Sequence, residues 1–167
     1  MAFYLSKERD RDVAGAYLRY QQYLQENRRK FPPNAFALGT AEWYQNPSDH
    51  RCPHDAWIEN LIISETATKE RHRGRYTTIH IRLLGAYHDG YIEFVYPQVF
   101  GYELHNACSE SLGDWLYDEF RLNSEGQLVH EIEWAPTHPG KEGARWIIIV
   151  SDVEFRWVPN ASLDIKQ

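Results

Sequence analysis

The sequence predicts an α+β domain in which two N-terminal helices pack on one face of an antiparallel sheet of about six strands. Three observations lead to this class. Helical periodicity is confined to residues 1–47, strand-like alternation occupies residues 52–158, and turn residues separate the alternating segments at hairpin spacing. A chain of 167 residues is long enough to bury one core, so residues 1–167 are expected to form a single domain.

The helical part is expected to contain two helices. Four apolar residues repeat at helical spacing on one side of the first: Val13, Tyr17, Tyr20 and Leu24. This helix should run from about residue 7 to 29, with Ser6 as its cap. Pro32-Pro33 ends it, because proline lacks the backbone N–H that a helix needs. A shorter helix follows Asn34 and ends near Asn46-Pro47.

The sheet is expected to be built from hairpins. Alternating segments predict strands at residues 55–64, 75–86, 91–96 with a continuation at 99–104, 115–122, 127–134 and 146–158. Asp89-Gly90 predicts a type I′ turn, because both central residues of that turn take positive φ. Pro97 interrupts its strand, and the last strand is expected to bend near Ser151-Asp152.

The second hairpin predicts a surface for a partner. With residues 123–126 as its loop, Trp115 faces Trp134, and three acids gather on one face: Asp118, Glu131 and Glu133. Like charges opposite each other cost up to about 1 kcal/mol, so such a cluster favours an exposed contact surface. The expected partner-binding residues are Trp115, Asp118, Glu131 and Glu133. No catalytic residue is assigned.

Charge is unevenly distributed along the chain, whose net charge is −6. Residues 1–33 hold seven Lys/Arg against four Asp/Glu, whereas residues 88–167 hold five against fourteen. The acidic C-terminal half argues against nucleic acid, which needs cations over its phosphates, and favours a basic protein partner. The alternative is that the acids only keep an aromatic-rich sheet soluble.

A histidine-rich stretch suggests a second function, a zinc-type metal site or a metal-dependent hydrolase. His50, Cys52 and His54 alternate, and His88 is available as a further ligand. In a straight strand the two outer histidines stand about 13 Å apart, too far to share a metal, so Pro53 would have to bend the chain. The structural alternative is that His54 and its neighbour Asp55 satisfy backbone groups where the chain enters the sheet.

Compartment and assembly are only broadly constrained. Cys52 and Cys108 form no disulfide framework, and neither an apolar leader nor a membrane-spanning segment is visible. A cytoplasmic protein without a membrane contact is therefore expected, with or without self-association.

From about residue 52 the chain resembles small bacterial immunity proteins, which are encoded beside polymorphic toxins. The similarity lies in the order of four stretches: "HDAWIENL", "LLGAYHDGYIEFVYP", "GDWLYDEFRL" with "HEIEW", and "WIIIVSDVEFRW". It implies a compact, acidic, non-catalytic module that binds and blocks one toxin domain. It carries no catalytic residues over to this chain.

Overall fold

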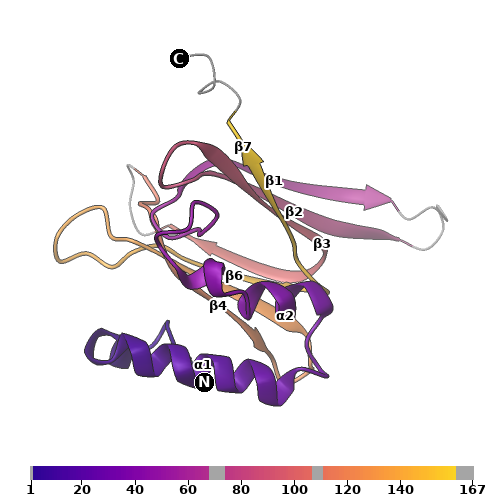
Figure 1. Cartoon of the computed structure of the whole chain (residues 1–167). Helices are drawn as coiled ribbons and strands as arrows, with labels where there is room; N and C mark the ends of the chain where they lie inside the picture. Colours follow the sequence, from indigo (N-terminus) through magenta and orange to yellow (C-terminus); the bar gives the residue numbers. More distant parts are fainter. Residues whose placement is uncertain (1, 68–73, 107–110, 161–167) are drawn as a thin grey trace.

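The computed structural model describes residues 2–67, 74–106 and 111–160 (Figure 1). Within these residues the α+β class is confirmed, with two α-helices and a seven-stranded antiparallel sheet. The helical elements are η1 (Lys7–Arg11), α1 (Val13–Asn27), α2 (Pro33–Gly39) and η2 (Glu42–Gln45). The strands are β1 (Trp57–Ala67), β2 (Arg75–Leu84), β3 (Gly90–His105), β4 (Trp115–Leu122), β5 (Leu128–Trp134), β6 (Arg145–Val150) and β7 (Glu154–Pro159).

The single helix expected over residues 7–29 is divided at Asp12. The Asp12 carboxylate accepts a hydrogen bond from the backbone nitrogen of Gly15 at 2.8 Å and so caps α1. Ser6 does not cap a helix with its side chain, which donates to the carbonyl of Phe3 instead. None of the helices that the structure describes has the length and apolar character needed to cross a membrane.

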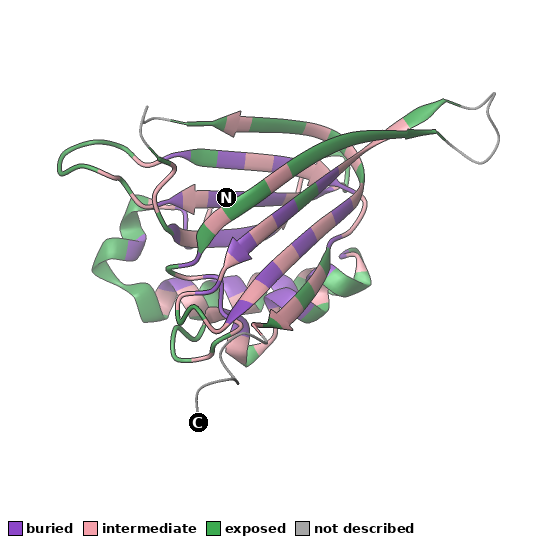
Figure 2. Cartoon of the chain, turned by 90° about the horizontal axis from the view of Figure 1, so that it is seen from above, coloured by how far each residue is buried: buried purple, intermediate pink, exposed green. Residues whose placement is uncertain are grey.

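The sheet curls until its two ends approach each other. The strand order is β1-β2-β3-β6-β5-β4, with β7 on the first half of β3, and Figure 2 shows the two halves of the sheet crossing at an angle. The backbones of Trp115 and Ala56 are joined by a hydrogen bond of 2.9 Å, and Asp55 donates to Trp115 at 2.8 Å. The start of β4 is therefore tied to the segment that leads into β1.

Strand β3 is longer than expected and passes through Pro97. Its first half pairs with β7 and its second half with β6, and the register with β2 shifts between Thr77 and Ile79. Pro97 lies at this changeover, where a strand tolerates the loss of an N–H donor. The turn before β3 is not type I′ at Asp89-Gly90, because the positive φ of 60° belongs to His88.

The register of the second hairpin differs from the expected one by one residue. Asn123 and Gln127 are joined by backbone and side-chain hydrogen bonds, and Gly126 has a φ of 78°. The loop is thus one residue longer than expected, and Asp118 pairs with Ile132 while Glu119 pairs with Glu131. A one-residue shift exchanges the two faces of a strand, so Asp118 points to the opposite face from Glu131.

The helices close the open side of the curled sheet (Figure 1). From α1, Tyr20 and Leu24 are fully buried, and Tyr44 of η2 packs against Phe120 of β4. The break between β6 and β7, which the sequence predicts at Ser151-Asp152, has a structural role. The Asp152 carboxylate accepts from the backbone nitrogen of Ala35 at 3.0 Å and so caps α2.

Candidate functional site

The acidic contact surface expected on the second hairpin is not exposed. Trp115, Asp118 and Glu131 retain 1%, 3% and 5% of their accessible surface. Glu133 is partly exposed, but its carboxylate is paired with Arg9 at 2.8 Å. The expectation of an exposed contact surface is therefore wrong for Trp115, Asp118 and Glu131, because the register shift turns Asp118 into the core and the N-terminal segment covers the other face.

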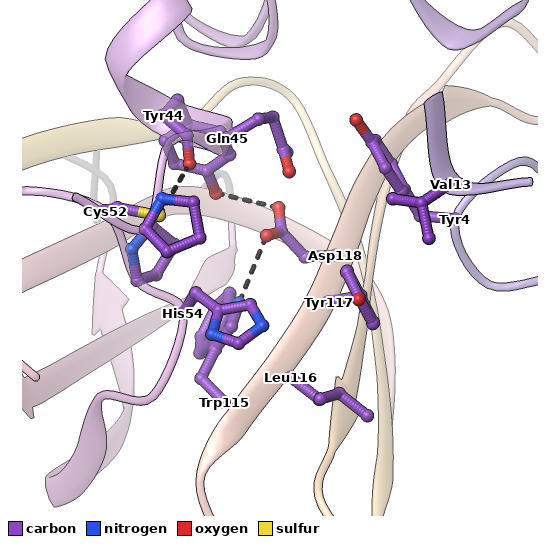
Figure 3. A pocket seen from close by; sticks show the side chains of 12 residues that line it. Tyr4, Val13, Tyr44, Gln45, Cys52, His54, Trp115, Leu116, Tyr117 and Asp118 are labelled. Carbon is purple, nitrogen blue, oxygen red and sulfur yellow. Dashed lines mark hydrogen bonds between the residues drawn. The ribbon is translucent and has the colours of Figure 1, made fainter. Parts of the chain in front are cut away.

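Asp118 is instead the centre of a buried hydrogen-bond network (Figure 3). Its carboxylate accepts from the hydroxyl of Tyr44 at 2.7 Å and from the indole of Trp115 at 3.1 Å, and it contacts Nε2 of His130 at 2.9 Å. The other ring nitrogen of His130 lies 2.8 Å from the hydroxyl of Tyr96. His130 has no exposed surface, so this Asp–His pair is a structural element of the core.

Burial also controls the ionisation of the tyrosines in this network. It raises the pKa of Tyr44 well above its usual value, and the negative charge of Asp118 raises it further. Burial does the same to the pKa of Tyr96, again reinforced by Asp118. Both hydroxyls therefore remain protonated, and Tyr44 acts as a hydrogen-bond donor to the carboxylate.

The acids on the other face hold the N-terminal segment against the hairpin. Glu119 accepts hydrogen bonds from the backbone nitrogens of Phe3 and Tyr4 at 2.9 and 3.0 Å. Arg121 lies between Glu119 and Glu131, with 2.8 Å from its Nε to the Glu119 carboxylate. Burial raises the pKa of Glu119, although these donors and Arg121 oppose the shift. This ionic cluster joins β4, β5 and the start of the chain.

The four expected metal ligands do not converge. The His50 ring contacts the carboxylate of Asp89, whereas the His88 ring packs edge-on against Trp57. The Cys52 thiol is buried and donates to the carbonyl of Tyr44 at 3.1 Å. Among the described residues, no group of three His, Cys, Asp or Glu side chains is placed to hold a metal. The metal hypothesis is therefore not supported by the geometry. Cys108 lies outside the described residues.

The stretch around His54 instead joins β1 to β4. Asp55 has a φ of 63° and donates its backbone N–H to Trp115, while its carboxylate lies 3.1 Å from Nδ1 of His54. Burial raises the pKa of the Cys52 thiol to about 12, so the thiol stays protonated and is a poor nucleophile. The two side chains thus contact each other, and the link to β4 is made by the backbone of Asp55 and not, as expected, by side chains that satisfy backbone groups.

A small pocket lies over Asp118, between η2 and the start of β4 (Figure 3). Its volume is about 160 Å³, and its lining includes Tyr4, Tyr44, His54 and Tyr117. Both oxygens of Asp118 already have partners within the protein. Three of the roughly four acceptor positions of this carboxylate are therefore already used within the protein.

Three strands lie at edges of the sheet, β1, β4 and β7, and α1 covers the edge of β4. The backbone nitrogen of Phe120 donates to the hydroxyl of Tyr20 at 2.7 Å, and that of Leu122 donates to the hydroxyl of Tyr23 at 2.9 Å. Both tyrosines belong to α1. The helix therefore satisfies backbone groups that would otherwise be available to another strand.

Strand β1 is the open edge of the sheet, a name used below for residues 57–67. In the described part of the chain it pairs with β2 alone, and Figure 2 shows it exposed along nearly its whole length. Trp57, Ile62 and Ile63 retain 49%, 47% and 41% of their surface. At 11 residues it is longer than a typical strand. Long, apolar edges of this kind pair with other chains.

An exposed aromatic side chain lies beside the start of the open edge. Tyr87, in the turn between β2 and β3, stacks on His50 with ring centres 4.1 Å apart and donates to the carbonyl of Pro47 at 3.1 Å. The ring of the neighbouring His88 packs edge-on against Trp57, with ring centres 4.7 Å apart. These contacts fix Tyr87 and Trp57 at one end of the open edge, where aromatic residues act as anchors in protein interfaces.

Comparison with protein-family models, with characterised proteins and with solved structures finds no match for this chain.

Proposed function

We propose that this chain is a non-catalytic protein-binding module that recognises its partner through the open edge. The contrast between the edge strands β1 and β4 carries the proposal. Two tyrosines of α1 occupy backbone groups of β4, whereas β1 presents its free side and three exposed apolar side chains. An extended segment of a partner can add to such an edge as a further strand, with main-chain hydrogen bonds and side-chain pockets.

The side chains that could take part in catalysis are engaged within the protein, which supports a binding role. Asp118 and His130 are engaged with each other in the core, and the Cys52 thiol is held protonated against a carbonyl. Neither arrangement offers an activated nucleophile to solvent. Trp57 and Tyr87, by contrast, are half exposed and held by neighbouring rings, as anchor residues of interfaces are.

The role that the resemblance implies is inhibition of a basic effector domain, and we include it in the proposal. The net charge of −6 supports it, because an acidic protein attracts a basic partner during encounter. The contact itself is assigned to the open edge and not to the acids of the second hairpin, which are buried or paired.

A site-specific photo-crosslinking experiment tests this proposal. A photoreactive amino acid at Ile63 should capture a partner in cells of the source organism, whereas the same group at Leu18 should not. Leu18 is a matched control, since it is an exposed apolar residue of α1, which covers the opposite edge.

The captured protein is then purified and titrated calorimetrically. Tyr87→Ala should weaken its binding at least about tenfold, equivalent to 1.4 kcal/mol, and Leu18→Ala should leave it unchanged. Equal capture at both positions, or an unchanged dissociation constant for Tyr87→Ala, contradicts the assignment of the surface. An acidic captured protein contradicts the assignment of a basic partner.

A further inference from the structure

The open edge has a residue pattern that reads the same in both directions. Residues 59–65 are Glu-Asn-Leu-Ile-Ile-Ser-Glu, so charged, polar and aliphatic positions are arranged symmetrically about Ile62. A two-fold interface requires this property, because the same patch must meet itself. We propose that β1 pairs antiparallel with β1 of a second copy about a two-fold axis at Ile62. This dimer is the resting form from which a partner displaces one copy.

The inference rests on the proposed function, since it concerns the same edge. It is tested without any partner, so its failure leaves the binding role to be judged separately.

The register follows from the geometry of the strand. From Asn60 to Ala67, β1 runs in unbroken register with β2, so side chains and backbone groups alternate regularly there. In an antiparallel pair, two residues that lie opposite each other point to the same face of the sheet. When both strands are β1, this requires the two-fold axis to pass through a residue and not between two residues. At Ile62 the axis places Leu61 opposite Ile63 and Asn60 opposite Ser64 of the second copy.

The neighbouring registers are less favourable. An axis at Leu61 would place Asn60 opposite Ile62, and an axis at Ile63 would place Leu61 opposite Glu65. Each would set an aliphatic side chain against a polar or charged one, and cross-strand pairs of like character are the stabilising ones.

The flanking charges are neutralised within each copy. Glu59 pairs with Arg82 at 3.3 Å, and Glu65 pairs with Arg75 at 3.0 Å. Glu59 lies in the bulge between Ile58 and Asn60, and its contact with Arg82 places its carboxylate on the face of Asn60. Glu65 lies on the face of Leu61 and Ile63, so the two carboxylates do not face each other across the axis, and each has its own arginine. The contact is thus an aliphatic centre between two electrically neutral flanks.

The shape of the molecule allows the approach of a second copy. Figures 1 and 2 show the hairpin of β1 and β2 extending beyond the other strands. The helix α1 lies against β4, at the other edge of the sheet. The second copy would therefore continue the sheet beyond β1 without meeting α1.

Analytical ultracentrifugation of the wild-type chain and three variants, each alone and without a partner, tests the dimer. The wild-type chain should sediment as a dimer in an equilibrium that dilution shifts across roughly 1 µM to 1 mM. Ile62→Lys and Ile62→Glu should each sediment as monomers, because the axis brings two like charges face to face. Leu18→Lys, with the same added charge on α1, should remain dimeric. Circular dichroism verifies that each variant is folded.

Mixing gives the decisive result. An equimolar mixture of Ile62→Lys and Ile62→Glu should restore a dimer, because lysine then faces glutamate across the axis. A variant that is merely misfolded would not recover in this way.

A monomeric wild-type chain over the whole concentration range overturns the proposal. A dimer that survives both Ile62 substitutions overturns it too, as does a mixture that stays monomeric.

Discussion

Removal of the Asp118 carboxylate is the sharpest test of the buried network. Asp118→Ala deprives Tyr44, Trp115 and His130 of their common partner, at original distances of 2.7, 3.1 and 2.9 Å. A buried donor left without an acceptor costs about 1–3 kcal/mol, and the three losses are not additive. We therefore expect a loss of about 3 kcal/mol or more, the upper end of the range for a single donor left unpaired.

Urea unfolding followed by tryptophan fluorescence measures this loss. Most single domains have only about 5–15 kcal/mol of stability, so the midpoint should fall markedly or the variant should unfold. Asp118→Asn preserves the shape and one acceptor, and it should lose less. Glu125→Ala, in an exposed turn, is the control and should change stability by less than about 0.5 kcal/mol. A loss below about 1 kcal/mol for Asp118→Ala would refute the structural role of the network.

Three further predictions concern the tyrosines and one glycine. Tyr20→Phe removes both hydrogen bonds to the β4 backbone, at 2.7 and 3.3 Å, and should cost about 1–3 kcal/mol in urea unfolding. Burial raises the pKa of Tyr20, Tyr44 and Tyr96 above the ordinary 10.0, so the unfolded chain loses these protons first. Stability should be independent of these groups below pH 10 and fall above it by up to about 1.4 kcal/mol per pH unit for each tyrosine, measured by unfolding at stepped pH. Gly90→Ala would place a methyl carbon 2.2 Å from the Trp157 ring, which should cost about 1–3 kcal/mol and shift indole fluorescence.

The elements of the fold could be predicted from local patterns, because the signal for each lies within a few residues. Helical spacing located α1, and alternation located β2, β4 and β5 within a few residues of their observed bounds. The break at Ser151-Asp152 was also predictable from turn chemistry. The division of the first helix was not predicted, although the apolar stripe begins only at Val13, because the expected cap was Ser6 and the capping role of Asp12 depends on its bond to Gly15.

The candidate site was less predictable, because one residue of register decided it. The Asn123 side chain bonds the backbone of Gln127 and lengthens the loop, which exchanges the faces of β4 relative to β5. Asp118 thereby points into the core, where its carboxylate accepts hydrogen bonds from Tyr44 and Trp115. The sequence gives no direct sign of partners that lie 74 residues apart in the chain.

The open edge could not be predicted, because strand order is a long-range property. Insertion of β6 between β3 and β5 leaves β1 and β4 at the ends of the main strand order, with β7 as a further edge beside β3, and nothing in β1 itself determines this. One signal was present, however. Leu61, Ile62 and Ile63 are consecutive apolar residues, which place aliphatic side chains on both faces of a strand that has a core on only one.

Amide hydrogen exchange on the monomeric protein tests the central claim most directly. At dilutions where sedimentation shows a single copy, alternate amides of residues 57–67 should exchange rapidly, because their backbone side is open. The amides of Phe120 and Leu122 should exchange slowly, since tyrosine hydroxyls hold them. Uniformly slow exchange along β1, equal to that of β4, would contradict the account.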